Sequence, residues 1–373
     1  MYDTNYEIQL RYAGTLIGNV YPITTARSWS KVKNGVDQIS FSVSMLKMQE
    51  WCEARNTTLA EIVKPLKLDA RVVRNGTPLL GGVLLEIPSY SLTNDSVDCE
   101  VSFTFDGYLN IYAGAYIRPT ITYSSRPLNQ YLVDLVNRAN TRAANAGAPT
   151  GVTIGATDTL PNDQNTYDSY KTVKDALTEQ TDNETGAGNF DIDFTYNRTF
   201  RIYKMMGDDR TDLIIRYPSV RGSINATSVS FDAWNSLATH VIGVGAGNGV
   251  GDGGAALTAE TTSSQDAYGI SEYGYYEQVF QDSSISQLST LKNKMSGVLQ
   301  QGTRVLLTPT IGVVGNQLDL GNTFWIGDRF TFHNDFDPFI PTSAILRVLE
   351  LDCTIDDTGA ENLKIKTEIY SEQ

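Results

Sequence analysis

Runs in which apolar and polar residues alternate constrain the fold of this 373-residue chain more than any other feature. Between residues 38 and 45, the apolar side chains Ile39, Phe41, Val43 and Met45 alternate with serine. Because successive side chains of a strand point to opposite faces, this period of two predicts a half-buried strand. Tyr (20), Phe (13) and Gly (31) are plentiful, which also favours strands joined by tight turns. The chain is therefore expected to be mainly β, with an α+β insertion.

Residues 1–124 are expected to form a first β-barrel-like domain. Strand patterns fill residues 5–46, a short helical excursion follows at 47–64, and strands resume at residue 68. Asn75-Gly76 predicts a tight hairpin because both residues tolerate a positive φ. A further turn at Asn94-Asp95 precedes a strand that runs to Tyr108.

Residues 125–210 are expected to form a small α/β domain. A helix is predicted after Arg126-Pro127, with an apolar stripe of Leu128, Leu132, Leu135, Val136 and Ala139. A second helix is predicted from Asp168, with Val173, Ala176 and Leu177 facing inward. The strands around Phe190–Phe194 and Phe200–Ile202 then predict a hairpin that one helix can cover.

Residues 211–373 are expected to form a second β-barrel-like domain. Within it, residues 268–280 predict a Tyr- and Gly-rich strand, and Gly327-Asp328 predicts a turn into a barrel strand. Residues 283–300 predict one amphipathic helix that begins at Ser283 or Ser284, stops at Gly302 and covers this barrel. Its stripe consists of Ile285, Leu288, Leu291, Met295, Val298 and Leu299.

Two segments of the chain share one pattern. Residues 68–105 and 326–369 each run as a meander with a long second strand and a closing strand of alternating polarity. Their sequence identity is low, but the shared order predicts two similar small barrels or sandwiches in one chain.

The charge of the chain argues against general nucleic-acid binding. The net charge is −14, whereas phosphate binding needs surplus Lys and Arg. Residues 1–80 carry a net charge of +3 and the remaining residues carry −17. The N-terminal end can thus meet a more acidic partner, or the asymmetry is ordinary scatter.

No residue is assigned to catalysis, to a cofactor or to a metal. Residues 249–254 match G-x-G-x-x-G, a pattern of dinucleotide-binding sites, but no strand–loop–helix pattern surrounds them. The Gly-rich loop 243–254 is therefore expected to be a surface loop that can order on a partner. His240 and His333 are the two histidines, about 90 positions apart on separate predicted strands, and the absence of a His–carboxylate or Cys–His cluster argues against a catalytic triad or a zinc site. The pairs Asp335/Asp337 and Asp356/Asp357 are interpreted as solvated turns, with Ca²⁺ sites as the alternative.

Two further groups of residues have an ordinary structural interpretation. Cys52, Cys99 and Cys353 are expected to be small buried hydrophobic residues, with a disulfide or a metal site as the alternative. The first 25 residues lack a signal-peptide pattern. Four tyrosines are expected to pack at a domain edge, or alternatively to form an interface or a sugar platform. They are Tyr268, Tyr273, Tyr275 and Tyr276.

The order of these elements resembles the hub proteins of phage tails, which also occur as the N-terminal part of tail-associated lysins. The resemblance lies in the order of several segments over nearly the whole chain. They are F-D-I-D-F-T-Y-N-R-T-F-R-I-Y after the second helix, N-S-L-A-T-H-V-I-G-V-G with its Gly-rich loop, Y-G-I-S-E-Y-G-Y-Y-E, the D-S-S-I helix, and L-G-N-T-F-W-I-G-D-R-F.

The resemblance implies a trimeric, non-enzymatic virion protein at the tail tip, assembled in the host cytoplasm. Three copies of two similar barrels would adapt a six-fold tail tube or distal tail ring to a three-fold tip, which carries fibre or receptor-binding proteins. DNA would pass through the channel without specific binding, and the negative charge would repel its phosphates. A hexameric distal tail protein is the alternative within this class. A cell-wall or capsule glycan hydrolase, or a glycan-binding tip protein, is the alternative from another class.

Overall fold

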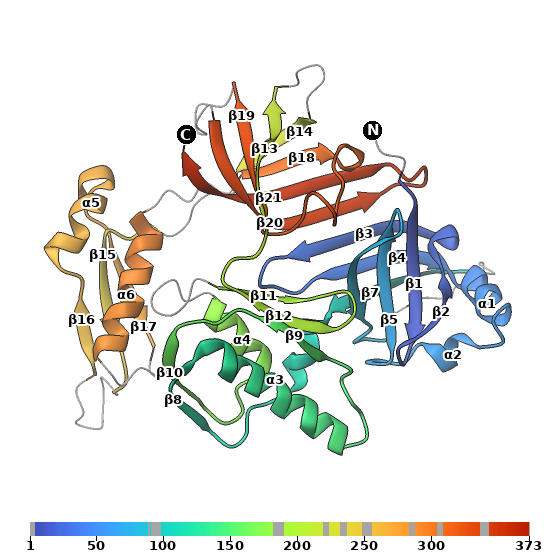
Figure 1. The fold of residues 1–373 in the computed structure, drawn as a ribbon, viewed down its shortest axis with the longest axis horizontal. Helices are drawn as coiled ribbons and strands as arrows, with labels where there is room; N and C mark the ends of the chain where they lie inside the picture. The colour runs from blue at the N-terminus through green and yellow to red at the C-terminus, as the bar shows by residue number, and fades with distance from the viewer. Residues whose placement is uncertain are drawn as a thin grey trace. The chain divides into compact units, whose positions relative to one another are not determined.

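The fold is seen in a computed structural model (Figure 1). It describes residues 4–88, 90, 98–181, 190–218, 224–231, 237–247, 256–282, 288–303, 309–335 and 343–372. The chain groups into two compact units. The first comprises Met1–Glu179, Phe190–Ser230 and Pro309–Gln373, and the second comprises Gln180–Asn189 and Phe231–Thr308. The predicted division into three domains at residues 124 and 210 stays a prediction.

Six strands of the first unit close into a barrel. In spatial order they are β19 (Arg329–Asn334), β13 (Asp209–Tyr217), β14 (Ile224–Phe231), β18 (Pro309–Val314), β21 (Glu361–Glu372) and β20 (Ser343–Ile355). The ring closes because β19 also pairs with β20, from Arg329 opposite Arg347 to His333 opposite Ser343. Alternate side chains of these strands fill the interior, as the period-two pattern predicts. They include Ile215, Ile311, Val313, Phe330, Phe332, Leu346, Val348, Leu363 and Ile365, all at most 1% exposed.

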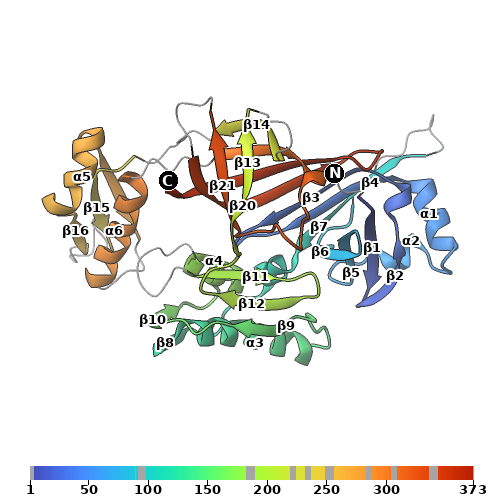
Figure 2. The same ribbon diagram turned by 45° about the horizontal axis from the view of Figure 1, so that its top comes forward.

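Seven further strands continue the same sheet from β20. In spatial order they are β3 (Thr24–Val32), β4 (Gln38–Ser44), β7 (Glu100–Gly107), β6 (Thr77–Val83), β5 (Leu68–Arg74), β1 (Tyr6–Tyr12) and β2 (Thr15–Asn19). The two halves join where β20 pairs antiparallel with β3, with Cys353 opposite Trp29. Stacked rings of Phe41, Phe103 and Phe105 pack in the core of this N-terminal half. The thirteen strands are therefore one continuous sheet (Figure 2).

The two halves share a strand order, as the repeated meander predicts. The order β1-β5-β6-β7-β4-β3 in the N-terminal half corresponds to β13-β19-β20-β21-β18-β14 in the barrel. In both, three sequential antiparallel strands lie beside an earlier antiparallel strand. Two pairings differ. β1 runs antiparallel to β5 whereas β13 runs parallel to β19, and β13 pairs with β14 whereas no pairing joins β1 to β3 among the described residues. The mainly β fold with two barrel-like halves is confirmed.

Local signals in the N-terminal half behave as predicted. Asn75 and Gly76 both have positive φ, 50° and 81°, in the hairpin between β5 and β6. The helical excursion forms α1 (Met45–Glu53) and α2 (Leu59–Ile62). The Ser44 hydroxyl accepts a hydrogen bond from the Lys47 backbone N–H and caps α1. Three short 3₁₀ helices complete the unit, η1 (Tyr21–Ile23), η2 (Tyr108–Gly114) and η3 (Gly315–Gln317).

The α/β part of the first unit follows its predicted pattern. Helix α3 (Leu128–Asn145) buries the whole predicted stripe, and α4 (Val173–Thr181) buries Val173, Ala176 and Leu177. Strands β11 (Asp191–Phe194) and β12 (Thr199–Tyr203) form the predicted hairpin, and β12 also pairs with β9 (Thr153–Thr157). Strands β8 (Ile121–Pro127) and β10 (Asn162–Tyr167) form a second small sheet. Figure 2 shows α3 beside the strands β9 and β12.

The second unit is a small α/β layer whose details differ from the sequence predictions. Its sheet has the order β16 (Thr258–Glu260), β15 (His240–Val244), β17 (Glu277–Gln281). Residues 268–273 belong to a helix, α5 (Ser263–Tyr273), and not to the predicted strand. The helix takes precedence because Thr262 and Gln265 form a capping box at its start.

The predicted amphipathic helix is present as α6 (Leu288–Thr303), but its apolar stripe packs on the small sheet of the second unit instead of on barrel strands. Leu291, Met295 and Leu299 are buried against Ala238 and Val241, within the second unit. Figure 1 shows α6 beside β15. The placement over the barrel is therefore wrong, because the apolar stripe fixes which face is buried but not which sheet it meets. The predicted start at Ser283 or Ser284 lies outside the described residues. No helix in the described ranges is long and apolar enough to cross a membrane.

Candidate functional site: the ion-paired joints of the scaffold

Arg74 and Glu361 form a buried joint between the two halves of the large sheet. Arg74 ends β5 and Glu361 begins β21. Arg74 Nε donates to Glu361 Oε1 at 2.6 Å, and Arg74 Nη2 donates to Oε2 at 2.9 Å. Nη2 also donates to the Leu318 carbonyl at 3.1 Å. Burial opposes the charge of Arg74, but the bonds to Glu361 outweigh it and raise the Arg74 pKa. The arrangement is a fork-to-fork pair suited to holding two elements in register.

Lys31 and two aspartates form a second joint, between β3 and the α/β part. Lys31 Nζ donates to Asp37 Oδ2 at 2.8 Å and to Asp193 Oδ1 at 2.5 Å. Asp37 Oδ1 also accepts from the Val32 backbone N–H at 3.1 Å. Burial, together with the nearby Asp193 carboxylate, raises the pKa of Asp37 to about 6 against the pull of Lys31. Two carboxylates thus share one buried ammonium group.

Asp191 extends this joint to the barrel. Its Oδ1 accepts from Lys33 Nζ at 3.0 Å, and its Oδ2 accepts from the Met206 backbone N–H at 2.7 Å and from Arg347 Nη2 on β20. Burial opposes ionisation, but Lys33 and Arg347 outweigh it and lower the pKa of Asp191. The Asp191 carboxylate on β11 therefore links Lys33, which follows β3, to Arg347 on β20. These three elements lie far apart in the sequence.

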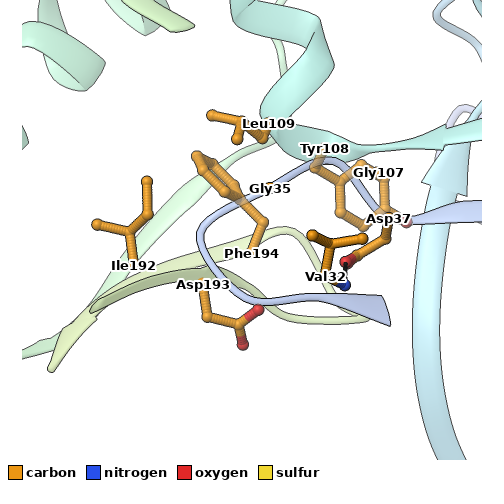
Figure 3. Close-up of a pocket in the computed structure, with 9 residues that line it drawn as sticks. All are labelled: Val32, Gly35, Asp37, Gly107, Tyr108, Leu109, Ile192, Asp193 and Phe194. Atoms are coloured by element: carbon orange, nitrogen blue, oxygen red, sulfur yellow. Dashed lines mark hydrogen bonds between the residues drawn. The ribbon is translucent and has the colours of Figure 1, made fainter. Parts of the chain in front are cut away.

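A cavity beside the second joint is too small for a substrate (Figure 3). Its volume is about 10 Å³, close to the space that one water molecule needs. It is lined by Val32, Gly35, Asp37, Gly107, Tyr108, Leu109, Ile192, Asp193 and Phe194. The Asp37 and Asp193 carboxylates of the joint thus lie at a nearly closed packing interface, which suits a structural role.

A larger hollow lies beside α1 and α2. Its volume is about 890 Å³, and apolar side chains such as Leu46, Leu59 and Val63 line most of it. Cys52 and Cys99 lie in this lining, and Cys99 is half-buried, whereas Cys353 is fully buried in β20. Burial raises the pKa of the Cys353 thiol above its ordinary value. The hydrophobic interpretation therefore holds for Cys52 and Cys353, and only in part for Cys99.

His240 has a carboxylate partner that the sequence analysis did not find. His240 Nδ1 lies 2.7 Å from Asp266 Oδ2, and the imidazole stacks on the Tyr275 ring at 5.6 Å. The pair joins the start of β15 to α5, and both residues are under 10% exposed. Twenty-six positions separate the two residues, and Asp266 lies in a helix that was predicted as neither helix nor site. No spacing rule connects such a pair.

The other candidate residues are scattered over the structure. Asp356 Oδ1 accepts from the Thr358 hydroxyl, the Ala360 N–H and the Thr358 N–H, bonds that lower the Asp356 pKa and cap a turn. Asp357 pairs with Arg27 at 3.4 Å. This geometry favours the turn interpretation of that pair. His333 lies on β19, and Asp337 lies outside the described residues, as do residues 248–254 of the Gly-rich loop. In the described ranges, no group of three or more His, Cys, Asp or Glu residues could hold a metal ion.

The four tyrosines gather on the second unit and are not packed inside it. Tyr268 and Tyr273 lie on α5, and Tyr275 and Tyr276 follow it. Their exposed fractions are 64%, 38%, 61% and 56%, in that order. The interpretation as ordinary edge packing is weaker than the alternative of an interface.

The fold as a whole is that of phage tail proteins. No family model and no curated protein matches the sequence. Three solved tail proteins share the architecture over nearly their full length. A 43 kDa tail protein of prophage MuSo2 from Shewanella oneidensis has a TM-score of 0.63 at 11% identity, with 97% of this chain and 98% of that chain covered. A tail protein from Neisseria meningitidis MC58 has 0.60 at 12% identity, covering 98% and 97%. Prophage tail protein gp18 from Listeria monocytogenes EGD-e has 0.56 at 16% identity, covering 98% and 95%.

This likeness shows that the chain has the fold of these phage tail proteins. The resemblance to tail hub proteins that the order of elements indicated is thereby confirmed at the level of the fold.

Proposed function

We propose that this chain is a trimeric hub of a phage tail tip or baseplate. The hub links the six-fold tail tube or distal tail ring to a three-fold tip and lines the path by which DNA leaves. Its partners are two further copies of itself, the ring above, and tip, fibre or receptor-binding proteins below. Its role is structural and not catalytic.

The observation that carries the proposal is the shared strand order of the two halves of the large sheet. A trimer that presents two similar halves per copy offers six similar surfaces around one axis, which a six-fold ring can contact. The buried pair Arg74–Glu361 supports this role, because it holds the halves in fixed register as a symmetry adaptor requires. The pair Asp191–Arg347 fixes the α/β part to the barrel.

The charge balance supports a channel that DNA crosses without binding. The chain has a net charge of −14, and residues beyond position 80 carry −17. Like charge along a lumen raises the energy of bound phosphates, so DNA slides and is not retained. The expected result in a DNA-binding titration at low salt is no retained duplex, and saturable binding would contradict the channel role.

The mass of the purified oligomer tests the proposal directly. Native mass spectrometry should give three times the 41.0 kDa chain mass. Six copies would favour a distal tail ring, and a stable monomer at high concentration would contradict both.

A zymogram on host envelope serves as the second test, because hydrolysis of cell wall or capsule would replace the structural role with an enzymatic one. Adsorption of the isolated protein to cells would favour the glycan-binding alternative.

A further inference from the structure

The second unit presents one open face of its small sheet. Helix α6 covers the other face, where Ala259 and Phe280 pack against its apolar residues, and a Cβ on Gly243 would meet Met295 Sδ at 2.3 Å. Since side chains alternate along a strand, the neighbours of these residues point away from α6. They are Thr258 and Glu260 on β16, His240, Ile242 and Val244 on β15, and Glu277, Val279 and Gln281 on β17.

The centre of this open face is apolar and its rim is acidic. Ile242 pairs with Val279 on one side and Glu260 on the other, and the Val279 side chain is 61% exposed. The Tyr275 ring lies beside them on His240, and its hydroxyl donates to Glu277 at 2.7 Å. Residues 256–282 contain five Asp or Glu residues and no Lys or Arg. The surface is therefore complementary to a basic partner that also carries apolar side chains.

Strand β17 is also an unprotected sheet edge. It pairs with β15 on one side in an unbroken register, from His240 opposite Glu277 to Val244 opposite Gln281, and with none of the other described strands. Natural edges are usually blocked by lysine, proline or a bulge. The sequence E-Q-V-F-Q of β17 has no lysine or proline, and its register has no shift. Such an edge is a template for an added strand.

We propose that β17 receives an extended, lysine- or arginine-bearing segment of another tail protein as an added strand. Main-chain hydrogen bonds supply the affinity. On the open face, every second side chain of the segment meets β17, with an apolar side chain at Val279 and a basic one at Glu277. The proposal rests on the role as a tail component, because the partner is sought among tail proteins, but it does not require the trimer.

The test uses the full chain and a peptide of about ten residues in which every second residue is threonine and the residues between run alternately lysine and valine, so that lysine and valine share one face of the added strand. Hydrogen exchange should show protection of the Glu277–Gln281 amides on binding, measured beside the affinity from fluorescence anisotropy. A matched peptide with glutamate in place of lysine should bind at least about tenfold more weakly. Equal binding of both peptides, or protection elsewhere in the chain, overturns the proposal.

Two variants distinguish peptide binding at the β17 edge from nonspecific binding elsewhere on the chain. Val279→Lys blocks the edge and should weaken the lysine peptide at least about tenfold. Leu16→Lys changes a side chain that is 50% exposed on β2, another edge strand, and should leave the affinity unchanged. Circular dichroism verifies that both variants fold. If Val279→Lys instead lowers the oligomer mass, β17 is a subunit interface, so this inference fails while the hub proposal stands. If the unchanged protein does not have the mass of a trimer, the hub proposal fails and the inference about β17 stands.

Discussion

Arg74 and Glu361 lie 287 residues apart in the chain and meet in two hydrogen bonds inside the first unit. The exposed fractions of their side chains are 1% and 0%. Removing both charges from water is costly, so the pair is tolerated only because each partner compensates the other. The two residues come from the two similar halves of the sheet, and they make the stability of each half depend on the other.

Glu361→Ala should therefore destabilise the first unit by about 3–5 kcal/mol, because it leaves a buried guanidinium without its partner. Urea unfolding of the full chain measures the loss. Glu179→Ala is the matched control, because the Lys171–Glu179 pair is exposed and should contribute less than about 1 kcal/mol. Equal losses in the two variants would show that the joint does not hold the halves together. The double variant Arg74→Met/Glu361→Leu should recover part of the stability.

Gly207→Ala should lower the stability of the fold far more than an alanine at another glycine of the same φ. Gly207 and Gly327 have φ of +87° and +84° and precede the paired strands β13 and β19. A Cβ on Gly207 would lie 2.0 Å from the Gly327 carbonyl carbon, so the backbone that leads into β13 and β19 must shift. Gly14 has the same φ of +87° and open space, so Gly14→Ala should cost only the conformational strain of about 1–2 kcal/mol.

Thermal unfolding of both glycine variants checks this difference. The expected loss for Gly207→Ala exceeds about 3 kcal/mol, since overpacking is added to the strain. Similar melting temperatures for the two variants would mean that the backbone before β13 and β19 can move to accommodate the Cβ at little cost in stability.

Features set by neighbouring residues were predictable from the sequence. The alternation of Ile39, Phe41 and Val43, the Asn75-Gly76 hairpin and the stripe of α3 each depend on a local period or turn, and each is confirmed. Helix α5 was missed because the tyrosines and two glycines at residues 268–276 suggested a strand, although T-x-x-Q at its start carried a capping signal. Aromatic residues favour strands only weakly, and tertiary context decides.

The partners of long-range contacts could not be predicted. The period of α6 identifies Leu291 and Met295 as buried, but it does not specify which sheet they pack against. His240–Asp266 and Lys31–Asp193 join residues 26 and 162 positions apart, and charge alone does not select one partner among 43 acidic residues. The candidate joints and the open face of the second unit thus required the structure.

Asp37→Asn should change how stability depends on pH between about 4 and 6. Folding raises the Asp37 pKa from 3.8 to about 6, so the folded state binds this proton more tightly than the unfolded chain. The resulting stabilisation is full below about pH 4 and is lost as the pH rises to about 6. Relative to the asparagine variant, the unchanged protein should lose up to about 3 kcal/mol across this range.

Asp191→Asn provides the opposite sign as a control. The Asp191 pKa is lowered, so its contribution is present above the ordinary aspartate pKa and is lost as the pH falls below it. Urea unfolding at a series of pH values compares the three proteins. If the curve of Asp37→Asn stays parallel to that of the unchanged protein from pH 4 to 6, Asp37 does not titrate in the joint.

Leu291→Asp should unfold the second unit and leave the first unit folded. Leu291 is 0% exposed and packs with Met295 against Val241, so a carboxylate there would be buried without a partner, at a cost of several kcal/mol. Lys292→Asp, at the next and exposed position of α6, should change little. Hydrogen exchange resolved by segment should show lost protection at β15 and β17 in Leu291→Asp, while the barrel strands β20 and β21 keep theirs. Equal loss in the barrel would restore the expectation from the sequence that α6 covers it, because a helix can destabilise only the surface on which it packs.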